Sequence, residues 1–217
     1  MSFFKYAKLQ GAYFYRQGQK LNYAKNRYLV TMHDESTSIY FLITGNVRVS
    51  FSLVDGSERI IGYFLPGMTF AKSGSFYSDE GGALEYKAVT PVTVLRLPRQ
   101  DFLAELKVNR QLNAEYMDIL LRNQIFLIDR IVYQGEQNVD KKFLRWLLFL
   151  AKYYAEEVDE TLRVMVSMSQ DDMANFLHVT RVSINKAISY FTKQGLIGRD
   201  GKYLIIHDVQ TIKHALS

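Results

Sequence analysis

The chain has 217 residues, 48% hydrophobic and 23% charged, which is enough to bury a sizeable core. Its formal net charge of +5 favours polyanionic partners without defining one. The absence of cysteine excludes disulfides, thiolate zinc sites and cysteine-ligated iron–sulfur clusters. The first ten residues lack an apolar signal core, and no stretch approaches the roughly 18 apolar residues of a membrane helix. We therefore expect a cytoplasmic protein with no membrane partner.

The first half of the chain is dominated by β patterns. Runs of β-forming residues cover residues 39–43, 47–53, 59–65 and 92–97. Asp55-Gly56 predicts a tight hairpin turn, and Pro66-Gly67 ends the third run. Many short strands at this spacing indicate an antiparallel barrel or sandwich.

The pattern becomes helical after Pro98. Residues 99–106 predict a short helix, and residues 109–133 carry apolar side chains at helical spacing with almost no turn residues. A helix of that length spans about 37 Å, more than a small domain needs. It either lies across the β domain as a core helix or also packs against its twin in a homodimer. Residues 141–154 predict a further, buried helix.

Two short helices follow in the C-terminal part. Ser169 is a candidate N-cap with Asp171 and Asp172 in the first turn, where acidic residues favour the positive helix end. After a short break, Thr180 is a second candidate N-cap for a helix over residues 181–194. Two helices joined by a tight turn, the second opening with polar and basic residues, are typical of a helix-turn-helix. An ordinary helical hairpin with a solvated face is the alternative.

A two-stranded wing is predicted next, with residues 196–199 and 202–206 flanking Asp200-Gly201. Arg181 suits a bidentate contact with guanine, and Thr180 and Ser183 can donate to phosphates. The predicted contacts with double-stranded DNA are Thr180, Arg181, Val182, Ser183, Asn185, Lys186, Ser189, Arg199 and Lys202. For the wing residues, exposed basic side chains without a partner are the alternative.

The ordered set of parts resembles the superfamily of the cyclic-AMP receptor protein and the fumarate and nitrate reduction regulator (CRP/FNR). The resemblance spans residues 21–206. It is carried by a motif over residues 39–49 like the family's first β-hairpin, the turns at Asp55-Gly56 and Pro66-Gly67, and residues 169–195 with the wing. It implies an α+β fold with an antiparallel jelly-roll (cyclic-nucleotide-binding-like) domain, a long dimerisation helix and a winged helix-turn-helix.

We accordingly expect an effector-sensing domain over residues 1–108, a dimerisation helix over residues 109–135 and a DNA-binding domain over residues 136–217. The resemblance implies a transcription regulator that binds a pseudo-palindromic DNA site as a homodimer, with RNA polymerase as a possible further partner. Two other classes stay open: a cupin-like metal enzyme and a winged-helix module that binds protein. The enzyme needs clustered histidines and carboxylates, whereas His33 is the only histidine of the β half, so no enzyme is expected.

Cyclic AMP is not the expected effector. In the family's cyclic-AMP binders a Gly-Glu pair holds the ribose and an Arg-Ser pair the phosphate, where this chain has Ala71, Lys72, Gly82 and Ala83. Without arginine, no planar fork is present to grip a phosphate. The hydroxyl pair that contacts adenine in the family is replaced by Leu127 and Ile128, which cannot hydrogen-bond a base.

Lys72 is surrounded in the sequence by aromatic residues, which suits a small aromatic or anionic effector. In this the chain resembles the subgroup of the family that senses halogenated aromatics, which also carries a lysine in this loop. The predicted lining residues are Tyr63, Phe70, Lys72, Ser73, Phe76, Tyr86, Leu127 and Ile128. A filled pocket with no small effector is the alternative, and haem on His33 is a further one. We predict no cofactor and no metal.

The recognition helix also departs from the family pattern. Its best-known members begin this helix with Arg-Glu, and here the pair is Arg181-Val182. Valine cannot accept a hydrogen bond from cytosine, but it can contact a thymine methyl. His178 stands where the turn usually holds glycine, so we expect it to adopt a left-handed conformation.

Overall fold

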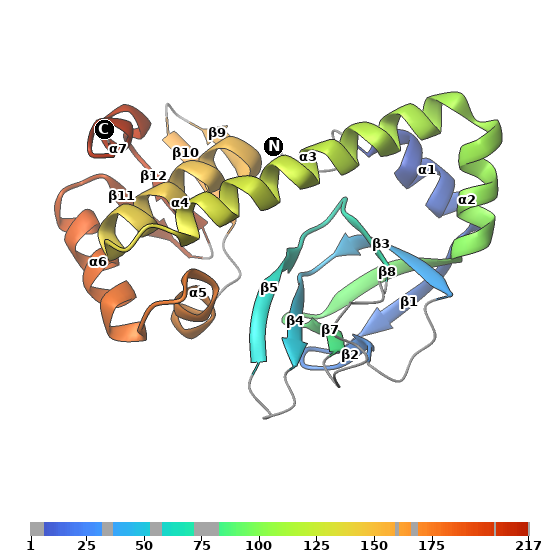
Figure 1. Cartoon of the computed structure of the whole chain (residues 1–217), viewed down its shortest axis with the longest axis horizontal. Coiled ribbons are helices and arrows are strands. Elements are labelled where there is room, and N and C mark those ends of the chain that lie inside the picture. Colours follow the sequence, from blue (N-terminus) through green and yellow to red (C-terminus); the bar gives the residue numbers. More distant parts are fainter. Residues whose placement is uncertain are drawn as a thin grey trace. The chain divides into compact units, whose positions relative to one another are not determined.

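A computed structural model describes residues 7–31, 37–52, 58–71, 83–158, 161–165, 169–201 and 203–216. The chain divides into two compact units, one reaching Leu121 and one beginning at Arg122. The boundary lies inside α3 (Arg110–Gln134), the long helix that was predicted over residues 109–133 (Figure 1). The three-part division predicted from the sequence stays a prediction. None of the described helices is long and apolar enough to cross a membrane.

The first unit is built on two four-stranded antiparallel sheets, which form the predicted β domain (Figure 1). The first sheet has the order β1 (Gln19–Tyr23), β8 (Val92–Pro98), β3 (Ser38–Thr44) and β6 (Thr69–Ala71). The second has the order β2 (Tyr28–Val30), β7 (Ala83–Ala88), β4 (Val47–Ser52) and β5 (Glu58–Phe64). β4 and β5 pair as the expected hairpin, although the Asp55-Gly56 turn lies outside the described residues.

The motif over residues 39–49 is not a hairpin, which corrects the prediction. β3 pairs with β8 and β6, whereas β4 pairs with β7 and β5, so the chain passes from one sheet to the other between them. Gly45 makes this corner with a φ of +83°, and a Cβ there would lie 2.2 Å from the carbonyl oxygen of Pro91. Asn46 N donates to Thr90 Oγ1 at 2.9 Å and fixes the corner. Only glycine fits here.

Helices α1 (Lys8–Gln17) and α2 (Arg99–Val108) and the start of α3 pack against the first sheet. Phe14 is the centre of this core, with its ring 5.4 Å from that of Phe41 and 5.3 Å from that of Phe102. α1 was not predicted and has no N-capping side chain of its own. Glu115 of α3 supplies the cap, because its two carboxylate oxygens accept from Leu9 N at 2.9 Å and Gln10 N at 2.7 Å.

The second unit contains α4 (Val139–Tyr154), α5 (Gln170–Leu177), α6 (Arg181–Lys193) and α7 (Val209–His214). Its antiparallel sheet has the order β11 (Ile197–Asp200), β12 (Tyr203–Ile206), β10 (Thr161–Met165) and β9 (Ala155–Val158). α4 is the buried helix predicted from the sequence, and Phe143 stacks on Phe191 of α6 at 6.0 Å.

The wing, β11 with β12, differs from the prediction in two ways. It belongs to a four-stranded sheet, because β9 and β10 were not foreseen. In addition, Asp200 pairs with Tyr203, so Asp200 belongs to the strand β11 and not to the turn. Gly201 has a φ of +57°, as a tight hairpin of this kind requires.

Candidate DNA-binding surface

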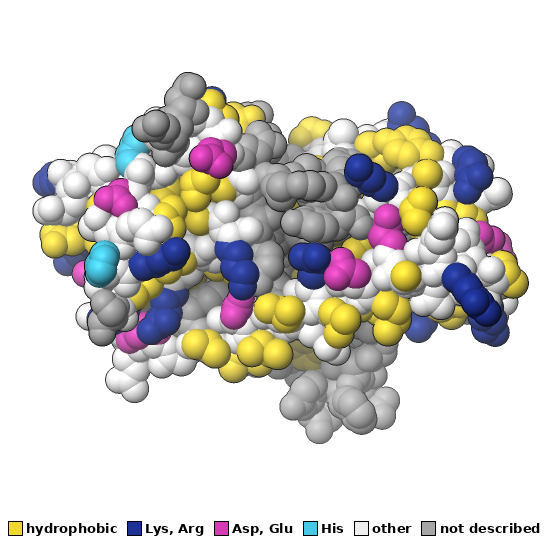
Figure 2. All heavy atoms as spheres, turned by 90° about the horizontal axis from the view of Figure 1, so that it is seen from above, with side chains coloured by type: hydrophobic (Ala, Val, Ile, Leu, Met, Phe, Trp, Pro, Cys, Tyr) yellow, Lys and Arg dark blue, Asp and Glu magenta, His cyan; other side chains and the backbone are white. Residues whose placement is uncertain are grey.

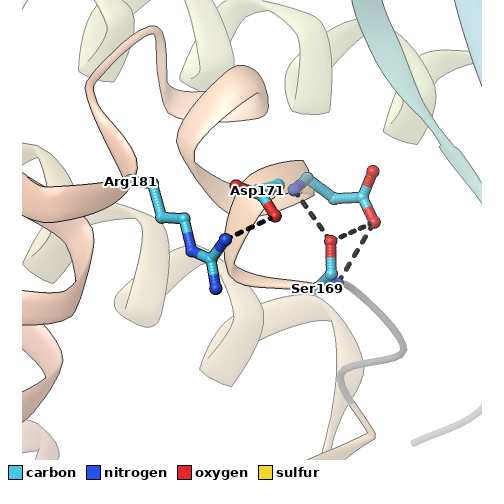
Figure 3. Close-up of polar contacts among 4 residues, drawn as sticks. Ser169, Asp171 and Arg181 are labelled. Carbon is cyan, nitrogen blue, oxygen red and sulfur yellow. Dashed lines mark hydrogen bonds and ion pairs between the residues drawn. The ribbon is translucent and has the colours of Figure 1, made fainter.

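The first helix of the helix-turn-helix begins at the predicted N-cap. Ser169 Oγ accepts from Asp172 N at 3.1 Å, and Asp172 Oδ2 accepts from Ser169 N at 3.2 Å (Figure 3). This reciprocal arrangement is a capping box, and it satisfies two backbone donors that have no partner within the helix. It fixes where α5 starts and therefore how its first turn is oriented.

The turn after α5 is made by His178, which has a φ of 53° and a ψ of 50°, as predicted. His178 N donates to Asn175 O at 3.3 Å, and Val179 N donates to Ala174 O at 3.0 Å. These two bonds define a Schellman motif, in which glycine is the usual left-handed residue. The motif ends α5 and reverses the chain in two residues, so that α6 can begin at once.

The second helix begins at Thr180, the other predicted N-cap. Thr180 Oγ1 accepts from Ser183 N at 3.1 Å and lies 2.9 Å from Ser183 Oγ. The two hydroxyls therefore bond each other, and only one of the two protons remains to donate to a phosphate. Ile184, Ala187 and Phe191 are buried on the inner side of α6, and its other side is left to solvent.

That outer side forms a continuous surface, which we call the recognition face. It is a shallow hollow lined by Val182, Asn185, Lys186, Ser189, Tyr190 and Lys193. Four of these residues were predicted to contact DNA. Tyr190 and Lys193 were missed, although they follow Lys186 at intervals of four and seven residues and so share its side of the helix. The spacing alone was sufficient to include them.

Arg181 lies at the start of α6 and makes an ion pair that the sequence did not reveal. Its Nη1 lies 3.2 Å from Oδ2 of Asp171 in the first turn of α5 (Figure 3). The side chains remain 59% and 61% exposed, so the guanidinium is held without being buried. Arg181 therefore stays available at the surface, but not as an isolated positive charge.

The wing carries a cluster of interacting charges near its tip. Arg199 is exposed on β11, and Lys202 lies outside the described residues. Arg163 of β10 pairs with Asp200 and lies over the ring of Tyr203, 4.7 Å from its centroid. Of the two wing residues predicted to contact DNA, Arg199 is described by the structure, and its side chain is exposed to solvent.

The predicted effector residues are only partly brought together. Phe70 and Tyr86 are buried, stack at 5.3 Å, and Tyr86 Oη donates to Ala71 O at 2.9 Å. Tyr63 precedes Phe64, whose ring packs against this core, so alternation along β5 directs Tyr63 to the opposite face. Lys72, Ser73 and Phe76 lie outside the described residues.

Leu127 and Ile128 lie on α3, where their side chains are 46% and 59% exposed. Exposed hydrophobic side chains of this kind are visible on the face shown in Figure 2.

Within the part of the chain that the structure describes, no three histidine, aspartate or glutamate side chains are grouped to hold a metal ion.

Comparison with known proteins agrees with this arrangement. Residues 20–109 match the cyclic nucleotide-binding domain family, and residues 141–215 match the Crp-like helix-turn-helix domain. The transcriptional activatory protein AadR of Rhodopseudomonas palustris is 26% identical over 188 residues, which cover 85% of this chain and 75% of AadR. These relationships extend over both units.

Solved structures share the fold. FixK2 from Bradyrhizobium japonicum matches with a TM-score of 0.75 and 19% identity, over 92% of this chain and 97% of its own. OCPA-complexed CprK matches with a TM-score of 0.70 and 16% identity, over 94% of this chain and 92% of its own. A β domain of the cyclic-nucleotide-binding type followed by a helix-turn-helix defines a DNA-binding transcription regulator. The chain belongs to the CRP/FNR superfamily.

Proposed function

We propose that the chain binds a pseudo-palindromic DNA site as a homodimer, under the control of an effector other than cyclic AMP. The proposal is based mainly on the recognition face, an exposed helical surface with two lysines and with Arg181 at its start. In a dimer the two α6 helices would enter successive major grooves about 34 Å apart. The known relatives are transcription regulators, which favours regulation over the cupin-like enzyme.

The contacts on each half-site divide into two kinds. Arg181 would read guanine O6 and N7, and Val182, which is exposed, would contact a thymine methyl. Lys186, Lys193 and Arg199 supply positive charge for phosphates, which would position the protein without reading sequence. Asn185 and Ser189 complete the surface between them.

The dimer proposal rests on a row of exposed apolar residues along α3. Leu121, Ile125, Ile128 and Val132 are all exposed and follow one another at intervals of four, three and four residues. That spacing produces the a and d seam of a two-stranded coiled coil. A second copy of the chain would cover this seam, and Ile128 then has a structural reason to be apolar.

The proposed effector is a small molecule other than cyclic AMP. Leu127 and Ile128 offer no hydrogen bond to adenine, which supports exclusion of cyclic AMP. CprK, which has the same fold, forms a complex with OCPA, and a small aromatic or anionic ligand remains our proposal for this chain. The stacking of Phe70 on Tyr86 favours the alternative, a filled interior with no small effector. Thermal-shift titration with aromatic acids and with cyclic AMP separates the two, since a ligand that binds the folded protein raises the melting temperature and a filled interior gives no shift.

Selection of bound duplexes from a random DNA pool, with and without cell extract, tests the function directly. We expect enrichment of a pseudo-palindrome, and dependence on the extract would reveal a required small molecule. RNA polymerase can be added to the enriched duplex to test it as a partner. If no sequence is enriched under either condition, the DNA-binding proposal is wrong and a protein-binding role for the winged domain takes its place.

A further inference from the structure

The ion pair between Asp171 and Arg181 connects the first turns of the two helices of the helix-turn-helix (Figure 3). Both side chains are more than half exposed, and ion pairs at such sites contribute little to stability. The ion pair therefore acts mainly on the position and the charge of the Arg181 guanidinium. That group lies at the start of α6, next to the recognition face.

Each partner has an electrostatic reason to keep this geometry. Asp171 is in the first turn of α5, where a carboxylate is favoured by the positive end of the helix. Arg181 is the first residue of α6, where the same effect disfavours a positive charge. Asp171 offsets that repulsion and occupies Nη1 of Arg181, leaving other guanidinium N–H groups to donate to a second acceptor.

We propose that Asp171 is a specificity-determining residue that holds Arg181 for base reading and cancels its charge toward phosphates. The proposal rests on the proposed function of α6 in the major groove. A bidentate contact with guanine needs a fixed guanidinium, and a side chain that is already oriented loses less entropy on binding. Non-specific binding instead depends on net positive charge at the phosphates, which the carboxylate reduces. Asp171 therefore favours the specific complex over the non-specific one.

The test uses Asp171→Asn in the full chain, with Asp140→Asn as the control. Asp140 is exposed in the first turn of α4, so its replacement removes the same charge from an equivalent helix position. Fluorescence anisotropy measures the Kd for the duplex enriched by the wild-type chain and for a scrambled duplex, over a range of salt concentrations. We expect Asp171→Asn to bind the scrambled duplex more tightly than the wild type does. The slope of log K against log salt concentration for that duplex should steepen by about 0.9 for each half-site.

The ratio of the two Kd values should fall about tenfold in Asp171→Asn, within the discrimination that one bidentate contact supplies. Asp140→Asn should leave that ratio unchanged. In an Arg181→Ala background, Asp171→Asn should have no further effect on the ratio, because the residue acts through the guanidinium.

An equal effect in the Arg181→Ala background would overturn the proposal, since Asp171 would then act only as a negative charge near DNA. An unchanged ratio in Asp171→Asn would also overturn it, while leaving the proposed function intact. Failure of the wild-type chain to enrich any duplex would instead contradict the proposed function itself. Circular dichroism of each variant confirms that the fold is retained, and Asp171→Glu, which keeps the charge, should retain more of the ratio than Asp171→Asn.

Discussion

His178 ends α5 with the same backbone geometry that Gly195 uses to end α6. Their φ angles are 53° and 71°, and in both cases the N–H of the following residue bonds to the carbonyl five residues before it, at 3.0 and 3.1 Å. Both helices therefore close with a Schellman motif. The position of the recognition helix depends on the first of these motifs, where a histidine replaces the usual glycine.

Replacing His178 tests this geometry. The left-handed conformation costs a residue with a Cβ about 1–2 kcal/mol, and a β-branched residue fits it worst. Histidine already bears part of this cost and is several-fold more common there than other residues, so we expect His178→Val to lower the free energy of unfolding by about 1 kcal/mol more. His178→Gly should match or exceed the wild type, because relief of strain offsets the greater entropy of glycine in the unfolded chain. Urea denaturation measures both, and a fully stable His178→Val would show that the motif is not under strain.

Removing the carboxylate of Glu115 should destabilise the start of α1. Glu115→Ala leaves two backbone donors without their acceptor, and loss of an N-cap of this kind costs about 1–2 kcal/mol. Glu115→Gln keeps one acceptor oxygen and should fall between the alanine variant and the wild type. Urea denaturation of the three proteins provides the comparison. Equal stabilities would mean that α1 does not depend on this cap.

Tyr116 should make the protein sensitive to alkali. Burial raises the pKa of Tyr116 above its ordinary value, and the nearby Arg99 opposes this only in part. Because the folded-state pKa is the higher one, the contribution to stability is complete below the unfolded pKa of about 10 and is lost as the pH rises through the folded value.

The variant Tyr116→Phe cannot ionise and keeps the ring that packs 5.2 Å from Phe102. Between about pH 9 and 11 the wild type should therefore lose more stability than this variant. Urea midpoints across this range measure the difference. Parallel pH profiles for the two proteins would exclude an effect of Tyr116.

A charge on the apolar seam of α3 should prevent dimerisation. Ile128→Lys places a positive charge at a residue that is 59% exposed in the single chain and buried in the proposed coiled coil. Leu103→Lys, on the exposed side of α2, makes the same chemical change away from the seam. Sedimentation analysis should find a dimer for the wild type and Leu103→Lys, and a monomer for Ile128→Lys. A dimeric Ile128→Lys would place the interface elsewhere.

The elements that sequence reasoning found are those with local signals. The caps Ser169 and Thr180 act through residues three positions away, and His178 stands where the turn of a helix-turn-helix usually holds glycine. The long α3 is visible because its apolar residues repeat at helical spacing over 25 residues.

The features that could not be predicted from the sequence depend on partners that are distant in the chain. α1 is capped by Glu115, more than a hundred residues away, so its own sequence carries no N-cap signal. The corner at Gly45 resembles a hairpin turn, and only the pairing of β3 with β8 shows that two sheets meet there. The pairing of Arg181 with Asp171 depends on the crossing of two helices, which spacing does not give.

Binding of Arg181→Ala to single-base variants of the enriched duplex tests whether α6 reads bases through Arg181. Fluorescence anisotropy should show a loss of about 1–3 kcal/mol on the enriched duplex and no remaining preference at one base of each half-site. Lys193→Ala, on the same helix, should weaken binding equally on every duplex and reduce the salt dependence. If Arg181→Ala kept every base preference of the wild type, Arg181 would not read DNA and the account of the recognition face would be contradicted.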